Sequence, residues 1–200
     1  MRLIGLATSW TVATAVGYLL TFYASLAVAL TLPFFFECDV SAWPVPDACE
    51  AIYRITLFPS LFIGGCALGL LQFAVFAFFL ASRSPWWIPA TALGYALPAY
   101  LEASRPGTSW QDIEIPYFLL LGFLLGVAQW LALRPTFRRA SLWIPATVAS
   151  AALAAALANQ AQAWPVFALV FGAATAVGLV FLVHINRTRR WPALNSRADR

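Results

Sequence analysis

Six long apolar stretches, separated by short polar segments, dominate the pattern of residues along the chain. They cover residues 9–33, 53–80, 86–102, 115–133, 141–160 and 164–184. Each approaches or exceeds the ~20 apolar residues that cross a hydrocarbon core about 30 Å thick. The third is the shortest and contains Pro89 and Pro98. The pattern predicts an all-α membrane protein with six transmembrane helices.

The first stretch also has features of a cleavable signal peptide. Arg2 precedes it, and Ala27 to Ala29 read "AVA", which resembles a cleavage site. However, the apolar run continues through Leu32, well beyond the roughly 7–15 residues of a signal-peptide core. We therefore expect a helix that is retained in the mature protein.

Charged residues are few, and they divide unequally between the two sides of the predicted helices. Only 10% of the chain is charged and 62% is hydrophobic. With the N-terminus on the cytoplasmic side, ten of the twelve arginines are cytoplasmic, and only Arg54 and Arg105 lie opposite. Seven of the eight acidic residues fall on that opposite side. Because cytoplasmic loops carry an excess of positive charge, both termini are predicted to be cytoplasmic, in a bacterial inner membrane.

The basic residues also suggest a contact with lipid. A six-helix domain, residues 1–186, is followed by a basic cytoplasmic tail, residues 187–200. Arginines beside helix ends attract anionic lipid head groups. Candidates for this contact are Arg138, Arg139, Arg187, Arg189 and Arg190. Since topology accounts for the net charge of +4, no nucleic-acid partner is expected.

The odd-numbered predicted helices share one sequence pattern. From Trp10 the chain reads "WTVATAVGYLLTFY", from Trp87 "WIPATALGYALPAY", and from Trp143 "WIPATVASAALAAA". In each, a threonine follows the tryptophan by four residues, at Thr14, Thr91 and Thr147. Residues four apart lie on one face of a helix. With tryptophans common at membrane interfaces, these three are predicted to anchor their helices there.

The even-numbered predicted helices share a second pattern. The second contains "GCALGLLQF", starting at Gly65, and the fourth contains "GFLLGVAQW", starting at Gly122. Gly69 and Gly126 follow by four residues, and Gln72 and Gln129 by three more. The sixth helix reads "ATAVGLVFL" over 174–182, which aligns Phe181 with the glutamines. Together the two patterns predict three repeated helical hairpins, over residues 1–82, 83–139 and 140–186.

These patterns predict how the helices pack. Glycines on one face let two helices approach closely in lipid, where apolar burial alone gives little drive for association. A glutamine that faced lipid would leave polar groups without partners. Gln72 and Thr91 are expected at similar depth, as are Gln129 and Thr147. We therefore expect Gln–Thr or Gln–backbone hydrogen bonds between helices, with a ligand or transport pathway at the glutamines as the alternative reading.

The run "GVAQWLALR" over 126–134, followed by "WIPAT", resembles a loose group of small multipass bacterial membrane proteins. In that group a G-x-x-Q-[WF] helix end leads to an arginine-bearing turn and a helix that starts with tryptophan. The resemblance covers the second and fourth helices and the turns after them. The group has no established function, so the resemblance supports the repeat and implies no activity. Phe181 departs from the pattern.

The first outer loop contains two cysteines, in "ECDVSAWPVPDACE" over residues 37–50. Cys38 and Cys49 lie on the side where disulfides persist, and a bridge between them would stabilise the fold by about 3 kcal/mol. A pair of free or metal-binding thiols is the alternative, but no histidine or third cysteine lies nearby. Cys66, inside the second helix, is expected to act as a small packing residue.

Residues for chemistry are scarce. The chain has no lysine, which excludes Schiff-base chemistry and P-loop phosphate binding. Its one histidine, His184, is a candidate ligand for a haem-like or chlorophyll-like pigment, or simply an interfacial polar residue. No carboxylate pair, nucleophile set or metal-spaced cluster lies within the apolar stretches. The sequence therefore predicts no enzyme, no metal and no required cofactor.

Two functional hypotheses remain. The first is a non-enzymatic accessory or structural subunit that packs against a larger membrane complex, or against further copies of itself, and can hold lipid or pigment. The second is a small transporter or channel with a polar pathway at Gln72 and Gln129. Partner, ligand and oligomeric state do not follow from the residues.

Overall fold

The computed structural model describes residues 2–36, 47–80, 84–103, 115–161 and 164–187, and in these ranges the chain is almost entirely helical. The α-helices are α1 (Arg2–Phe36), α2 (Asp47–Leu80), α3 (Trp87–Ala103), α4 (Ile115–Leu133), α5 (Trp143–Ala161) and α6 (Trp164–Arg187). A short 3-10 helix, η2 (Ala140–Leu142), precedes α5. An all-helical fold follows from the composition, since in lipid a helix satisfies its backbone polar groups within one segment.

Five of these helices contain a stretch that is long and apolar enough to cross a membrane. The stretches are Leu3–Ala24, Phe58–Leu80, Pro116–Leu133, Ala140–Ala161 and Pro165–Asn186. The remaining helix, α3, has 17 residues and was also the shortest of the six predicted segments. The prediction of an all-helical protein with several membrane-spanning segments is therefore confirmed at this level.

Four of the helices have a proline close to their first residue. Pro89, Pro116, Pro145 and Pro165 each lie in the first turn of α3, α4, α5 and α6. The first N–H groups of a helix have no partner within it, so a residue without an N–H is tolerated there. Two further prolines, Pro59 and Pro98, lie inside α2 and α3.

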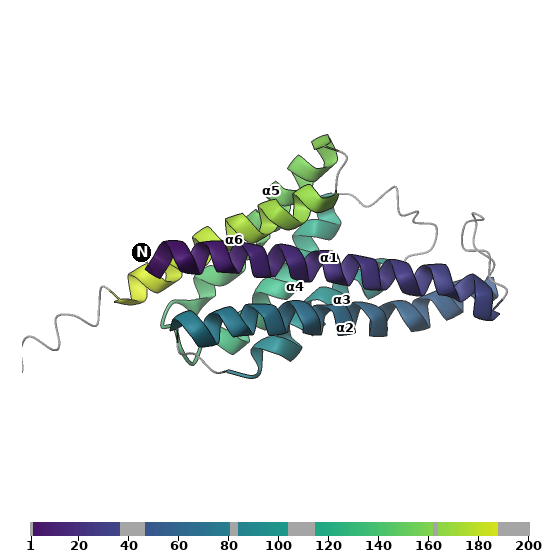
Figure 1. Ribbon diagram of the computed structural model, residues 1–200, viewed down its shortest axis with the longest axis horizontal. Coiled ribbons are helices and arrows are strands. Elements are labelled where there is room, and N and C mark those ends of the chain that lie inside the picture. The colour runs from purple at the N-terminus through teal and green to yellow at the C-terminus, as the bar shows by residue number, and fades with distance from the viewer. Residues whose placement is uncertain (1, 37–46, 81–83, 104–114, 162–163, 188–200) are drawn as a thin grey trace, which may run out of the picture.

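The helices form a closed ring. Each packs against its neighbours in the chain, and α6 packs against α1 to close the circle. In Figure 1, α1 and α2 lie side by side and extend beyond the other helices. The N-terminus and the end of α6 lie at the same end of the bundle (Figure 1). The ring thus encloses a common interior, onto which all six helices face.

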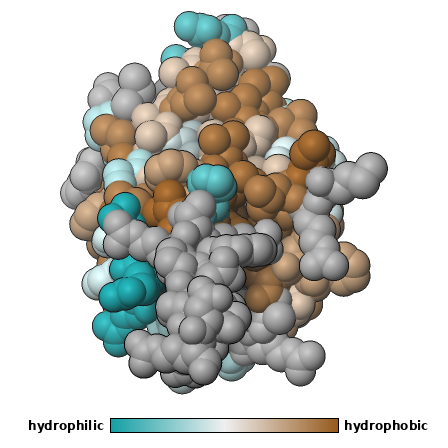
Figure 2. Space-filling model, turned by 90° about the vertical axis from the view of Figure 1, so that its left-hand side faces the viewer, coloured by the Kyte–Doolittle hydropathy of each residue, from teal (hydrophilic) through white to brown (hydrophobic). Residues whose placement is uncertain are grey.

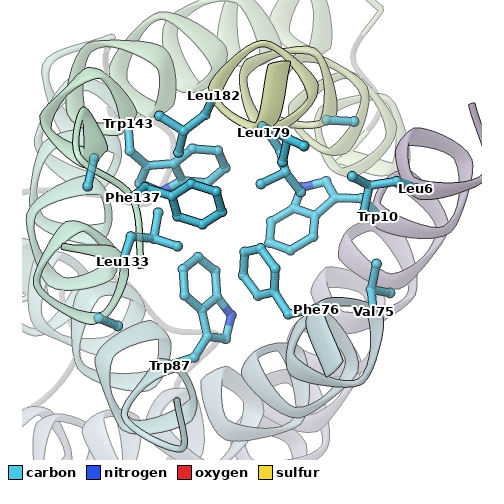
Figure 3. Packing of buried hydrophobic residues seen from close by; sticks show 14 of the residues in the cluster. Leu6, Trp10, Val75, Phe76, Trp87, Leu133, Phe137, Trp143, Leu179 and Leu182 are labelled. Atoms are coloured by element: carbon cyan, nitrogen blue, oxygen red, sulfur yellow. The ribbon is translucent and has the colours of Figure 1, made fainter. Parts of the chain in front are cut away.

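The two largest hydrophobic clusters of the described residues lie at different heights in this interior, and a third, small one contains Leu61 and Ala96. The first lies toward the end of the bundle that carries the N-terminus, and includes Leu6, Phe76, Leu133, Phe137 and Leu179. Figure 3 shows these side chains pointing toward one another, Phe137 from the turn after α4 and the others from the surrounding helices. The second cluster, farther along α1, includes Tyr18, Leu68, Leu125, Phe167 and Phe171. Between the two clusters lies a layer of polar side chains.

Candidate functional site: a buried polar belt

Three tryptophans meet inside the ring. Trp10, Trp87 and Trp143, the tryptophan triad, are 0%, 2% and 1% exposed. Their ring centroids are 5.8 Å apart for Trp10 and Trp87, 6.0 Å for Trp10 and Trp143, and 6.3 Å for Trp87 and Trp143. These edge-to-face contacts are favourable arrangements of aromatic rings. Figure 3 shows the triad among the aliphatic side chains of the first cluster.

The sequence placed these tryptophans at the membrane interface as anchors, and that prediction is wrong for all three. They begin or lie near the start of their helices, as expected, but their side chains turn inward rather than outward. The physical reason is that each indole N–H has a buried acceptor. The neighbouring Trp86, by contrast, is 72% exposed.

Each indole of the triad donates a hydrogen bond to an even-numbered helix. Trp87 Nε1 donates to Gln72 Oε1 at 3.2 Å, and Trp143 Nε1 donates to Gln129 Oε1 at 2.8 Å. Trp10 Nε1 donates to Thr175 Oγ1 at 3.1 Å. The three bonds join α3 to α2, α5 to α4, and α1 to α6. One type of contact therefore recurs at three of the six junctions in the ring.

The glutamines also donate to the odd-numbered helix on their other side. Gln72 Nε2 donates to Thr14 Oγ1 at 3.0 Å, and Gln129 Nε2 donates to Thr91 Oγ1 at 3.1 Å. Gln129 Nε2 also lies 3.3 Å from Gln72 Oε1 and donates to it. Each glutamine thus bridges two helices, and the two glutamines meet. The partner threonine belongs to the helix before the glutamine, not to the helix after it as the expected depths suggested.

The sixth helix supplies a threonine where the others supply a glutamine. Thr175 is 2% exposed, accepts from Trp10, and donates to the Phe171 carbonyl oxygen at 2.8 Å. Phe181, which the sequence alignment matched with the glutamines, is 56% exposed on the outside of the ring. Phe181 therefore does not share the buried environment of the glutamines, whereas Thr175 does. Read from Ala168, the segment gives Ala-x-x-x-Gly-x-x-Thr, which matches Gly-x-x-x-Gly-x-x-Gln.

One side of the ring lacks a bridge of this kind. Thr147 Oγ1 donates to the Trp143 carbonyl oxygen of its own helix at 2.8 Å. Thr175 likewise donates within its own helix. A threonine is too short to reach across as glutamine does, so within the described part of the chain these two side chains form no hydrogen bond between α5 and α6.

We call the six buried polar side chains that lie between the two largest hydrophobic clusters the polar belt. Its members are Thr14, Gln72, Thr91, Gln129, Thr147 and Thr175, all at most 2% exposed. Buried polar groups that hydrogen-bond one another rigidify a core, whereas unpaired ones are costly. Amides, hydroxyls and indoles also carry no charge at physiological pH. As arranged, the belt joins neighbouring helices through hydrogen bonds between uncharged side chains.

The predicted glycines lie where neighbouring helices approach each other closely. A Cβ atom on Gly69 would come 3.0 Å from Ile88 Cα, and one on Gly126 would come 3.1 Å from Ile144 Cα. Gly172 makes the matching contact on α1, where a Cβ would come 2.9 Å from the Thr11 carbonyl oxygen.

Gly65 and Gly122 approach the same neighbouring helices one turn away. Their added Cβ atoms would lie 2.7 Å from Ala92 Cα and 2.8 Å from Val148 Cα. At all these positions the neighbour is backbone, so a side chain would separate the helices.

The remaining candidate residues do not meet the belt. His184 is exposed on α6, as are Arg138 and Arg139 in the turn before α5. The backbone N–H of Arg138 donates to Asn186 Oδ1 at 3.1 Å, which ties this turn to the end of α6. Arg189 and Arg190 lie outside the described residues, and the side chain of Arg187 is not among those described.

The structure gives no support to the disulfide predicted between Cys38 and Cys49. Cys38 lies outside the described residues, and the side chain of Cys49 is not among those described. Cys66 in α2 is a half-buried free thiol. Within the described part of the chain, no group of three His, Cys, Asp or Glu residues could hold a metal ion.

Sequence reasoning missed three functional features: the inward turn of the tryptophans, the role of Thr175, and the burial of Tyr18. The sequence does contain a signal for the inward turn of the tryptophans. Tryptophan and threonine recur four residues apart on the same helix face, so a buried threonine implies a buried tryptophan. Thr175 could have been found by aligning Gly172 with Gly69 and Gly126.

Compared with family models, curated proteins and solved structures, the chain matches none. The resemblance of residues 126–134 to a group of small bacterial membrane proteins therefore stays a prediction.

Proposed function

We propose that the chain is a non-enzymatic integral membrane protein, an accessory or structural subunit whose closed helix ring packs against a larger membrane complex. The observation that carries the proposal is the use of the polar belt. The amide groups of Gln72 and Gln129 hydrogen-bond to Trp87, Trp143 and two threonines rather than facing a cavity. A ring held this firmly from inside leaves its outer face to meet lipid or other subunits.

The outer face fits this role. Large apolar side chains are exposed on every helix, among them Val12, Ile63, Leu93, Phe123, Leu153 and Val177. In water such an apolar surface would promote aggregation, whereas in a bilayer apolar side chains normally form the lipid-facing surface of a helix bundle. Figure 2 views the end of the bundle with the N-terminus and shows hydrophobic residues over much of it, with hydrophilic residues mainly at the lower left and smaller groups at the top and near the centre.

Both termini are proposed to be cytoplasmic, in a bacterial inner membrane. The exposed Arg134, Arg138 and Arg139 support this orientation, because they lie in the turn between α4 and α5. In Figure 1 that turn lies at the same end of the bundle as the N-terminus. The excess of arginine on this side follows the usual charge rule, and these side chains would contact anionic head groups.

We also propose that the ring consists of three repeated hairpins, α1–α2, α3–α4 and α5–α6. The recurring indole bonds at Gln72, Gln129 and Thr175 support it, as do the matching contacts of Gly69, Gly126 and Gly172. Three copies of one hairpin in a ring would place equivalent side chains at the same height in its interior. The side chains of the polar belt have this arrangement.

A small transporter or channel is the second candidate. The contact between Gln72 and Gln129 favours it, because this contact puts polar groups together in the interior of a closed ring. A pathway there would require the tryptophan triad to move, since the three indoles fill the interior next to the belt.

Purification in mild detergent followed by native mass spectrometry tests the first proposal. We expect a partner chain, or further copies of this chain, at fixed stoichiometry. A visible absorption spectrum of the same sample tests for pigment. Ion or solute flux in proteoliposomes that is lost in both Gln72→Leu and Gln129→Leu, while these variants keep their fold, would contradict the subunit proposal and favour the channel.

A further inference from the structure

One buried hydroxyl lies apart from the polar belt and has no hydrogen-bond partner. Tyr18, in α1, is 6% exposed, and its Oη atom is fully enclosed without a partner among the described residues. Tyr18 lies within the apolar stretch Leu3–Ala24, where bulk water is absent if the segment crosses the membrane. A buried polar atom without a partner is rare in native proteins and often marks a bound water or ligand.

Two more tyrosines come close to this hydroxyl. The Tyr18 and Tyr95 rings are in edge-to-face contact, with centroids 5.1 Å apart. Tyr117, from the start of α4, packs against the same cluster. Tyr95 and Tyr117 also both pack against the small cluster of Leu61 and Ala96. We call Tyr18, Tyr95 and Tyr117 the tyrosine cluster.

The cluster has a defined place in the ring. Tyr18 follows Thr14 by four residues and Tyr95 follows Thr91 by four, so both lie one turn beyond the polar belt on its other side from the triad. On α5 the matching position is Ala151, which is 0% exposed and carries no hydroxyl. Phe167 and Phe171 of α6 contact the Tyr18 ring instead, with centroid distances of 5.5 Å and 5.4 Å. The polar groups therefore gather toward α1, α3 and α4.

We propose that the tyrosine cluster binds a hydrogen-bond-accepting oxygen atom that bridges Tyr18 to its neighbours. Tyr18 packs beside two further tyrosines, yet its Oη atom has no hydrogen-bond partner among the described residues. A bridging oxygen resolves this arrangement, because buried waters make about two to four hydrogen bonds to such groups. The oxygen belongs either to a water molecule or to the hydroxyl or carbonyl group of a small amphiphile. The aromatic walls suit the apolar part of the latter.

The test compares thermal unfolding, in one detergent, of the wild-type chain with Tyr18→Phe and with the matched control Tyr23→Phe. Tyr23 lies on the same helix and is 61% exposed. With a bridging oxygen in place, Tyr18→Phe removes one of its partners, so the midpoint should fall by about 2–4 °C. Tyr23→Phe should leave the midpoint unchanged.

An unoccupied cluster gives the opposite sign. Removing a hydroxyl that has no partner relieves a buried unsatisfied group, so Tyr18→Phe would then raise the midpoint. A midpoint equal to or above that of the wild type overturns the proposal. So does a high-resolution experimental structure without ordered density about 2.6–3.2 Å from Tyr18 Oη.

Native mass spectrometry separates the two sources of the oxygen. A bound mass that is present in the wild type and absent in Tyr18→Phe identifies an amphiphile. A lower midpoint with density at Tyr18 Oη, but with no bound mass, identifies water.

Discussion

Each tryptophan of the triad combines two roles that usually separate in membrane proteins. The rings pack against one another and against Phe76, whose centroid is 4.6 Å from that of Trp87. The N–H groups meanwhile find acceptors in the polar belt. A tryptophan without such an acceptor would move its polar edge to the interface. The acceptors Gln72, Gln129 and Thr175 therefore fix the direction of these side chains.

Replacing one indole tests this account. Trp143→Phe keeps an aromatic ring but removes the donor to Gln129 Oε1, the shortest of the three indole bonds at 2.8 Å. We expect the free energy of unfolding in detergent to fall by about 1–3 kcal/mol, since a buried acceptor loses its partner. The control Trp86→Phe, at an exposed position, should change it by less than about 0.5 kcal/mol.

Thr175 gives a second test at a single residue. Thr175→Val preserves the shape of the side chain and removes the acceptor of Trp10 Nε1. We expect a loss of about 1–2 kcal/mol in thermal or denaturant unfolding. Phe181→Leu is the matched control on the same helix and should be nearly neutral, because Phe181 faces outward. Equal effects of both substitutions would contradict the role assigned to Thr175 as a buried acceptor.

The candidate site was predicted in part. Gln72, Gln129 and three threonines were identified from their spacing, because a glutamine in an apolar run must find a partner. The particular partners could not be predicted. Gln72 bonds to Thr14, 58 residues away, and Trp10 bonds to Thr175, 165 residues away. Which helices become neighbours depends on the closure of the ring, and periodicity within one helix does not contain that information.

At the scale of the helices, glycine determines how closely neighbours approach. Gly65 and Gly69 place α2 against the backbone of α3, and Gly122 and Gly126 place α4 against that of α5. The short distance between backbones lets the glutamines reach both flanking helices. Close contact and hydrogen bonding therefore depend on each other, which explains why both motifs occur together in the sequence.

Two alanine substitutions separate close contact from helix propensity. In Gly65→Ala the new Cβ would lie 2.7 Å from Ala92 Cα, so α2 and α3 must move apart. We expect a loss of about 1–3 kcal/mol in unfolding free energy. In Gly5→Ala the nearest atom is the Phe79 ring at 3.3 Å, which can shift. That variant should be neutral or up to about 1 kcal/mol more stable, because alanine favours a helix.

The apolar stretches predicted α3 to α6 closely but underestimated the first two helices. The predicted ranges were 9–33 and 53–80, whereas α1 spans Arg2–Phe36 and α2 spans Asp47–Leu80. Hydropathy marks the part of a helix that suits lipid. Backbone hydrogen bonds continue beyond that part wherever residues permit, so helix ends outside the apolar region are not set by hydropathy.

At the scale of the whole molecule, orientation follows from the distribution of arginine. Ser141 is exposed in the arginine-bearing turn, and Gln160 is exposed near the far end of α5. The test uses Ser141→Cys and Gln160→Cys, each introduced into a chain whose native cysteines are replaced by serine. A membrane-impermeant maleimide added to the outside of the inner membrane should label Gln160→Cys and leave Ser141→Cys unlabelled. The reverse pattern would place the termini outside.

The central claim is that the polar belt holds the helix ring together. The unfolding free energy of the double variant Gln72→Leu/Gln129→Leu in detergent tests it most directly. Leucine has a similar volume to glutamine but forms no side-chain hydrogen bond. The variant therefore loses the four bonds from the glutamines to tryptophan and threonine, and the bond between the two glutamines. The account predicts a decrease of about 2–4 kcal/mol, with two tryptophan N–H groups left unpaired. A double variant as stable as the wild type would contradict it.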